Sequence, residues 1–137
     1  MSFRLTGNNG IDHEANHRAR LLGQAQFMLT EAPMRLCVEN PVGLIGSRIR
    51  PADQYIQPYW FGHDASKRTG LWLADLPTLR SDPSLYVEPR RVNGRPRWAN
   101  QTDSGQNKLG PSADRADKRA ETYSGIAAAM AAQWGAR

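Results

Sequence analysis

The residues best suited to chemistry in this sequence are four arginines that flank a two-residue turn signal. Asn93-Gly94 is the strongest short hairpin signal, so residues 86–98 are expected to form a β-hairpin. The hairpin carries a basic cluster that consists of Arg90, Arg91, Arg95 and Arg97. These arginines suit phosphate contact, and Trp98 can stack on a nucleic-acid base. The alternative is a solvated hairpin on which the arginine stems cover Tyr86 and Trp98.

The whole chain is basic, with 137 residues, a formal net charge of +5 and a pI near 9.9. Such a charge favours polyanionic partners, nucleic acid first, although many small basic proteins bind none. The length suits one small domain with one modest core. We therefore treat residues 12–137 as a single domain, and residues 1–11, which are polar and contain Gly7 and Gly10, as a flexible lead-in.

Nothing in the sequence predicts export or membrane insertion. No stretch of about 18 apolar residues exists, and the first residues lack the apolar core of a signal peptide. The single Cys37 cannot form an internal disulfide, which fits a reducing cytoplasm. His13, His17 and His63 do not make a metal-binding set with this one cysteine, so no metal is expected.

A carboxylate follows the first candidate strand. Residues 35–38 form a short apolar run that fits a buried strand, and it ends in Glu39-Asn40-Pro41, because proline cannot extend the hydrogen-bond ladder. A carboxyl group at the C-terminal end of a strand faces the ligand crevice of an open α/β sheet. If it is desolvated there, Glu39 can hold a proton and donate it. The alternative is a solvated carboxylate at the end of a strand.

Helices are expected at both ends of the domain. Asp12 can cap a helix over residues 12–31, whose apolar stripe consists of Leu21, Leu22, Ala25, Met28 and Leu29. A short helix is expected over residues 112–120 and a last one over residues 124–134. The last helix would present one apolar face, which consists of Ala127, Met130 and Trp134.

Short strands and loops fill the middle of the chain. Strands are expected over residues 55–61, interrupted by Pro58, and over residues 69–73. The expected loops are residues 42–54, with Gly43 and Gly46, residues 75–84 and the polar residues 100–113. The spacing of the tryptophans assigns three of them to the core, namely Trp60, Trp72 and Trp134.

Six segments carry a resemblance to a known family. In chain order they read VENPVG (38–43), QPYWFGH (57–63), SKRTGLWL (66–73), NQT (100–102), SGQNKLGP (104–111) and TYSGIA (122–127). Segments like these, in this order, are similar to those of small phage and prophage DNA cytosine methyltransferases. The resemblance covers about the last three quarters of the chain, from Met34 onward, and corresponds to the C-terminal half of such an enzyme.

The resemblance implies roles for particular residues. In this family a cysteine thiolate attacks a flipped-out cytosine, and the glutamate of a Glu-Asn-Val motif holds the base. Glu39 and Asn40 resemble that motif, with Pro41 in place of valine. Lys67 and Arg68 loosely match a Gln-x-Arg-x-Arg motif whose arginines steady the base, and the alternative is a basic loop that contacts phosphate or solvent. The segment 125–127 loosely matches the motif that closes the donor pocket, or it is plain helix packing.

Two parts that the family needs for catalysis are missing from the sequence. No strand followed by a Phe-x-Gly turn, which cradles S-adenosylmethionine, precedes Met34, and Gly7-Asn8-Asn9-Gly10 follows no expected strand. The family nucleophile is a cysteine that follows proline in a loop, whereas Cys37 lies within the apolar strand and is expected to be inert. The chain alone is therefore expected to bind no S-adenosylmethionine and to transfer no methyl group.

The resemblance implies an α/β fold that consists of an incomplete Rossmann-like methyltransferase sheet with flanking helices and a β-hairpin. A parallel sheet cut through its middle exposes an apolar edge, so a second copy or a protein partner is expected to cover it. We expect a subunit or binding module in the bacterial host cytoplasm, with DNA as a possible ligand. The alternatives are a phage-encoded, non-catalytic inhibitor of a host defence protein and a non-specific DNA-binding module.

Overall fold

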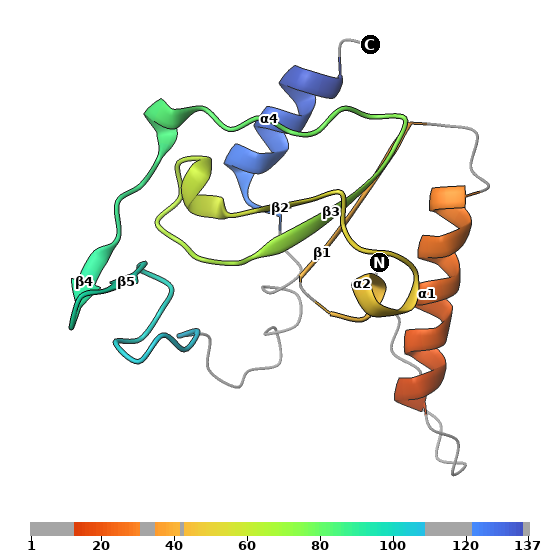
Figure 1. Cartoon of the computed structure of the whole chain (residues 1–137), viewed down its shortest axis with the longest axis horizontal. Coiled ribbons are helices and arrows are strands. Elements are labelled where there is room, and N and C mark those ends of the chain that lie inside the picture. Colours follow the sequence, from red (N-terminus) through yellow and green to blue (C-terminus); the bar gives the residue numbers. More distant parts are fainter. Residues whose placement is uncertain (1–12, 31–34, 42, 109–121, 136–137) are drawn as a thin grey trace.

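The computed structural model describes residues 13–30, 35–41, 43–108 and 122–135 (Figure 1). Its helices and strands, in chain order, are α1 (His13–Thr30), β1 (Leu36–Pro41), α2 (Leu44–Arg48), β2 (Gln54–Ile56), the 3-10 turn η1 (Pro58–Trp60), β3 (Thr69–Ala74), the 3-10 turn η2 (Pro83–Leu85), β4 (Arg90–Val92), β5 (Arg95–Arg97) and α4 (Ser124–Trp134). No helix among these residues is both long and apolar enough to cross a membrane.

The centre of the fold is a three-stranded sheet with the order β1-β3-β2. Both pairings are antiparallel, with Glu39 opposite Leu71 in the first and Ile56 opposite Thr69 in the second. Because β1 and β2 both run against β3, they run in the same direction as each other. The chain is therefore mixed α/β, with β3 as the strand that joins the other two.

The expectation of a parallel sheet is wrong for the pairings between described strands. The reason lies in the connection from β2 to β3. No crossover helix of the kind that parallel neighbours need follows β2. Instead η1 turns the chain, and Phe61 N and His63 N both donate to Pro58 O, at 2.9 and 3.3 Å. The chain then returns beside β2 as an antiparallel strand.

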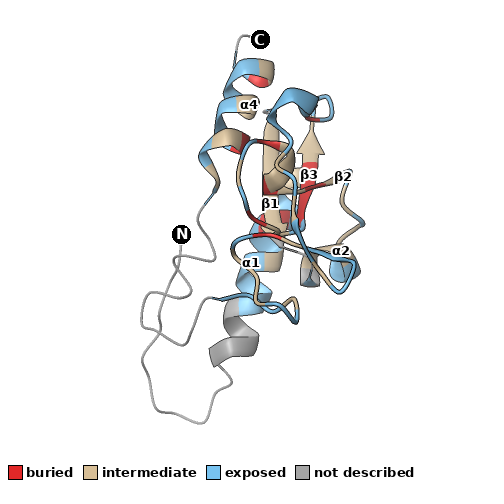
Figure 2. Cartoon of the chain, turned by 90° about the vertical axis from the view of Figure 1, so that its left-hand side faces the viewer, coloured by how far each residue is buried: buried red, intermediate tan, exposed pale blue. Residues whose placement is uncertain are grey.

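One face of the sheet packs against α4. Side chains alternate between the faces of a strand, and directly paired residues share a face. Leu71 of β3 and Ile56 of β2 are almost completely buried in a cluster that also contains Phe61, Leu79, Ile126 and Trp134. This cluster is the main core, and it fixes α4 on this side of the sheet (Figures 1 and 2).

The other face of the sheet is centred on Trp72. Its ring is 1% exposed, and its indole Nε1 donates to Arg50 O at 2.7 Å. Gly46 of α2 lies beside the same ring, and a Cβ there would be 3.9 Å from it. The helix α1 contacts α2, β1 and β3, so two helices cover this face.

The apolar residues of the two long helices are used unequally. Among residues 18–30 of α1, whose burial is described, only Ala25 is buried, whereas Leu21 and Met28 are 44% and 40% exposed. The expected stripe therefore lies only partly against the sheet. On α4 the buried stripe is built on Ile126 and Trp134, and Ala127, which was expected to share that face, is exposed.

The strands and turns differ from the expectation in length. The first strand extends through Pro41, which pairs with Thr69 in the last rung, so Glu39 lies within the ladder and not beyond it. The expected loop at Gly43 and Gly46 contains the short helix α2, and the expected strand over residues 55–61 becomes β2 followed by η1. The strand over residues 69–73 is confirmed as β3.

The hairpin at Asn93-Gly94 is confirmed. Its two turn residues have φ values of 50° and 76°, and both are positive, as a type I′ turn requires. The strands β4 and β5 are only three residues each, with Arg90 opposite Arg97. The expected lead-in over residues 1–11 and the helix over residues 112–120 lie outside the described residues.

Replacing Gly125 with alanine is expected to destabilise the fold by about 1–3 kcal/mol, as overpacking does. A Cβ at this position would run into Phe61 O and would lie 2.8 Å from His63 Nε2. The matched control is Gly23→Ala in α1, where a Cβ meets nothing within 4 Å. Alanine there should be neutral or stabilising by up to about 1 kcal/mol, because it favours the helix. Urea unfolding measures both changes, and equal effects would contradict this packing.

Candidate functional site

Glu39 lies near the C-terminal end of β1, on the face of the sheet that carries α4. It is paired with Leu71, whose side chain is fully buried on that face. The carboxylate is half-buried, and its Oε2 accepts a hydrogen bond from Thr122 Oγ1 at 3.1 Å. Glu39 therefore connects the end of β1 to the segment that leads into α4.

The first turn of α4 brings further polar side chains to the same segment. His63 Nε2 accepts a hydrogen bond from Gly125 N at 2.8 Å, and this requires that nitrogen to be unprotonated. The His63 ring lies 5.1 Å from the Tyr123 ring. Lys67 Nζ lies 5.9 Å from the centroid of the Tyr123 ring. A carboxylate, an imidazole and an ammonium group thus all contact residues 122–125.

The two basic residues of the expected Lys67-Arg68 motif diverge. Lys67 contacts Tyr123 on the α4 side, whereas the Arg68 guanidinium lies 4.1 Å from the Tyr55 ring centroid. Tyr55 is paired with Gly70 and so lies on the opposite face of the sheet from Glu39. Of the two, only Lys67 is brought to the segment that Glu39 contacts.

Cys37 lies two residues before Glu39, on the same face of β1, and is half-buried. Burial, with smaller contributions from the carboxylates of Glu39 and Asp53, raises the pKa of its thiol to about 12. A thiol that stays protonated at neutral pH is a poor nucleophile. The geometry agrees with the expectation that Cys37 is inert.

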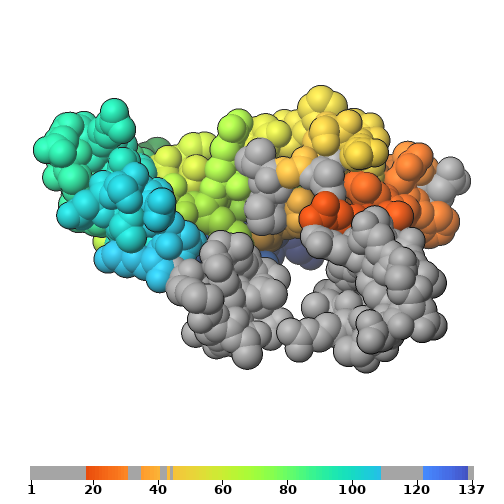
Figure 3. Space-filling view, turned by 90° about the horizontal axis from the view of Figure 1, so that it is seen from below, coloured from red at the N-terminus to blue at the C-terminus, as the bar shows by residue number. Residues whose placement is uncertain are grey.

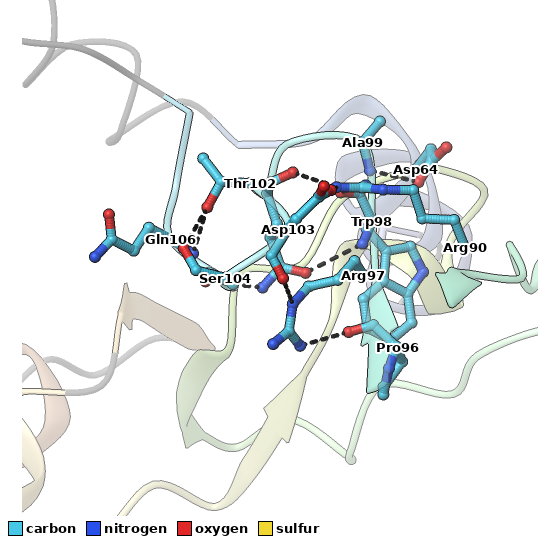
Figure 4. A network of polar contacts seen from close by, with 12 residues as sticks. Asp64, Arg90, Pro96, Arg97, Trp98, Ala99, Thr102, Asp103, Ser104 and Gln106 are labelled. Atoms are coloured by element: carbon cyan, nitrogen blue, oxygen red, sulfur yellow. Dashed lines mark hydrogen bonds and ion pairs between the residues drawn. The ribbon is translucent and has the colours of Figure 1, made fainter. Parts of the chain in front are cut away.

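Two of the four hairpin arginines bind the chain itself (Figure 4). Arg90 donates to Trp98 O at 2.7 Å and to Gln101 O at 2.8 Å, and its guanidinium forms an ion pair with Asp103 at 3.2 Å. Arg97 Nε donates to Asp103 O at 3.1 Å. Both guanidinium groups therefore hold the loop after β5, and this structural role was not anticipated from the sequence.

The other two arginines of the hairpin, Arg91 and Arg95, are exposed. Within residues 43–108 and the other described segments, neither side chain makes a hydrogen bond or an ion pair. Their cross-strand partners are Pro96 and Val92, so they lie on opposite faces of the hairpin. The hairpin and α1 lie at opposite ends of the molecule (Figures 1 and 3).

Trp98 is part of the packing and does not present a free face. It is 7% exposed, its ring stacks on Tyr59 with centroids 3.8 Å apart, and its Nε1 donates to Val87 O at 3.0 Å. A base could stack on Trp98 only after Tyr59 had been displaced. The prediction that Trp98 stacks on a base does not fit this arrangement.

Three side-chain amides hold extended segments in place, and we call them the amide clamps. Each clamp binds the backbone N–H and C=O of one residue, as a neighbouring strand would. The pairs are Gln54 with Leu79, Asn100 with Ser66, and Gln133 with Arg80. In the Asn100 clamp both distances are 2.8 Å. The sequence shows only ordinary polar amides at these positions, so no local signal reveals the clamps.

The amides of the loop after β5 bind other parts of the protein. Asn100 is a clamp, and Gln101 Oε1 accepts from Trp98 N at 3.1 Å. Gln101 and Asn107 form an isolated bridge across the loop. The side chains of Asn100 and Gln101 are therefore engaged within the protein.

No metal site or known relative adds to this description. The part of the chain that the structure describes contains no group of three or more histidine, cysteine, aspartate or glutamate side chains that could hold a metal ion. No family model, no curated protein and no solved structure matches the chain.

The raised pKa of Cys37 predicts slow alkylation of the folded protein. At pH 8 an ordinary cysteine with a pKa near 8.5 is substantially ionised, whereas a thiol with a pKa of about 12 is almost entirely neutral. Iodoacetamide should react at least about 100-fold more slowly with the folded chain than with the same chain in urea. The stability that the neutral thiol contributes is present below about pH 8.5 and is lost as the pH rises toward 12. Equal rates in the folded and unfolded chain would contradict the shift.

The two kinds of hairpin arginine are expected to differ in their effect on stability. Arg90→Ala should destabilise the protein by about 1–2 kcal/mol, because two backbone carbonyl groups and Asp103 lose their donor. Arg91→Ala, the adjacent control, should change stability by no more than about 0.5 kcal/mol. Urea unfolding compares them, and a similar loss in both variants would contradict the assignment.

Proposed function

We propose that this chain is the C-terminal half of a DNA cytosine methyltransferase of the phage type, inactive alone, which works with a partner that supplies the donor-binding half. In this proposal Glu39 holds the target base. The partner contributes the S-adenosylmethionine pocket and the cysteine nucleophile. The chain contributes one wall of the site and part of the surface that contacts DNA.

The observation that carries the proposal is the bonding between segments that resemble the family. Glu39 binds Thr122, which joins the first segment to the last. His63 binds Gly125 at the start of α4. These contacts span 83 and 62 residues of sequence. Segments selected to form one site would be expected to meet in this way.

Three more contacts extend the same network. Gln57 Oε1 accepts from Lys67 N at 2.9 Å, which ties together the segments 57–63 and 66–73. The Asn100 clamp on Ser66 attaches the segment 100–102. Gln106 N donates to Thr102 Oγ1 at 3.1 Å, so all six family-like segments are linked by side-chain hydrogen bonds. This support is geometric and independent of the sequence similarity.

The sheet is compatible with the proposal although its described pairings are antiparallel. The strands β1 and β2 run in the same direction, with β3 reversed between them. Mixed sheets, which contain parallel and antiparallel pairs, are common among large α/β sheets, and parallel pairs would have to come from strands beyond the three described. In this proposal the parallel, Rossmann-like part of the sheet consists of strands that a partner adds beside β1.

The edge of β1 is where such a partner would bind. Among the described strands β1 pairs only with β3, so its other edge has no described strand beside it. The strand has six residues, of which the first three, Leu36, Cys37 and Val38, are apolar, and such an edge is a template for pairing with another chain. We propose that a strand of the donor-binding half pairs there, and that a second copy of this chain pairs there when that half is absent.

The experiment is a reconstitution of methyl transfer from two halves. The chain is co-expressed with the N-terminal half of a phage-type DNA cytosine methyltransferase that contains the glycine turn and the proline-cysteine loop. Transfer of labelled methyl groups from S-adenosylmethionine to DNA is expected from the complex and not from the chain alone. Glu39→Gln should lower the rate by about 10²- to 10⁴-fold, as loss of a proton donor does. The control Glu88→Gln changes an exposed carboxylate and should leave the rate unchanged.

The reconstitution can contradict the proposal in separate ways. If the halves do not associate, the proposed role of the β1 edge is wrong. If the complex is active and Glu39→Gln is as active as the original chain, the base-binding role is wrong. If millimolar S-adenosylmethionine alone raises the melting temperature of the isolated chain, the donor pocket is not missing.

A further inference from the structure

A cavity of about 460 Å³ lies between η1 and η2, away from Glu39. Its lining is mainly apolar and consists of Trp60, Ser81, Asp82, Pro83 and Tyr86. The volume falls in the range of small-molecule pockets. Tyr86 is 43% exposed, so an aromatic ring is available to a ligand there. We call this cavity the aromatic pocket.

The aromatic pocket is joined to the basic hairpin through Tyr59. The Tyr59 ring meets the rings of Trp60 and Tyr86 edge to face, at 6.1 and 5.7 Å between centroids. Its face stacks on Trp98, which directly follows β5. Val87 N donates to Tyr59 O at 2.9 Å, so the backbone beside Tyr86 is held as well. The base of the hairpin and the wall of the pocket therefore form one packed unit.

The exposed arginines of the hairpin lie within reach of the pocket. Arg91 follows Tyr86 by five positions in the sequence, and five residues of extended chain span at most about 17 Å. That distance corresponds to only a few nucleotides of a single strand. Arg91 and Arg95 are the hairpin arginines that the loop does not use, so their positive charge remains available to phosphate.

The pocket itself favours a base over a phosphate. Hydrogen bonds from Ser84 Oγ and Ser84 N lower the pKa of Asp82, so this carboxylate is ionised at neutral pH. A negative group in the lining repels a phosphate but accepts hydrogen bonds from an N–H group of a base, either an exocyclic amino group or the ring N3–H of thymine. An aromatic wall with positive charge outside it is the usual arrangement of single-strand binding sites.

We propose that the aromatic pocket receives an unstacked base of a single-stranded nucleic acid, stacked on Tyr86 and Trp60, while the strand passes around the hairpin so that one phosphate contacts Arg91 and another contacts Arg95 on the opposite face. The inference rests on the proposed function and adds where the nucleic acid binds. It can be wrong while the proposed function is right, because it involves neither β1 nor Glu39. A proline-rich peptide also fits aromatic grooves, but the basic hairpin gives an uncharged peptide no partner.

The test measures binding of the full chain to a fluorescein-labelled twelve-nucleotide oligo(dT) by fluorescence anisotropy. Tyr86→Ala should weaken binding by about 5- to 150-fold, the usual effect of removing one stacking side chain. Tyr86→Phe keeps the ring and should bind nearly as tightly as the original chain. The control Leu85→Ala changes a neighbour that is 46% exposed and does not line the pocket, and it should have no effect.

A salt series tests the arginines separately. Each phosphate contact contributes about −0.7 to the slope of log affinity against log salt for a single strand. The double variant Arg91→Ala/Arg95→Ala should therefore reduce the slope by about 1.4. Arg18→Ala on α1 is the control, because it removes one positive charge at the opposite end of the molecule.

Four results would overturn the inference. The first is that oligo(dT) shows no measurable binding, and the second is that Tyr86→Ala binds it as tightly as the original chain. The third is that Tyr86→Ala and Leu85→Ala lose the same affinity. The fourth is that a proline-rich peptide binds, that Tyr86→Ala abolishes this binding, and that oligo(dT) does not compete with the peptide. None of them bears on association at β1, which the reconstitution measures.

Discussion

The burial of β3 is the constraint on which the rest of the described fold depends. Both of its edges are paired, and both of its faces are covered. Leu71 and Trp72 are neighbours and point to opposite faces, so each is almost completely buried. Leu71 joins the cluster under α4, and Trp72 fills the space beside α2. A single short strand therefore holds two layers of helix on one sheet. The position of Glu39 follows from this, because its register against Leu71 turns it toward α4.

Outside the helices and strands, the amide clamps form the hydrogen bonds that hold extended segments in place. The segment after β3 has no strand partner, but Gln54 and Gln133 bind the backbone of Leu79 and Arg80 there from two different elements. Satisfying backbone groups in this way lets an extended segment cross the surface without a ladder. Arg90 does the same for the loop after β5. The candidate site and the aromatic pocket both lie between segments fixed by such contacts.

The sequence predicts the parts of the fold that have local causes. The α1 and α4 helices, β3 and the turn at Asn93-Gly94 follow from periodicity and turn chemistry. The direction of the sheet, the stacking of Trp98 on Tyr59 and the use of Arg90 within the loop were not predicted, because each depends on a residue distant in sequence or on the path of a loop. The contact of Glu39 with Thr122 was not predicted either, because the resemblance to the family identifies residues in the sequence but not their positions in space.

The clamps have a consequence for how the protein responds to its medium. A side-chain amide is neutral and does not titrate, so its hydrogen bonds are neither screened by added ions nor altered by protons. The ion pairs Arg50–Asp53 and Arg90–Asp103 are both partly exposed. The clamped segments are thus insensitive to added salt and to pH, whereas the loop after β5, which Arg90 and Asp103 help to hold, is not. Ionic strength can therefore change association through the net charge of +5 while the three clamps stay unchanged.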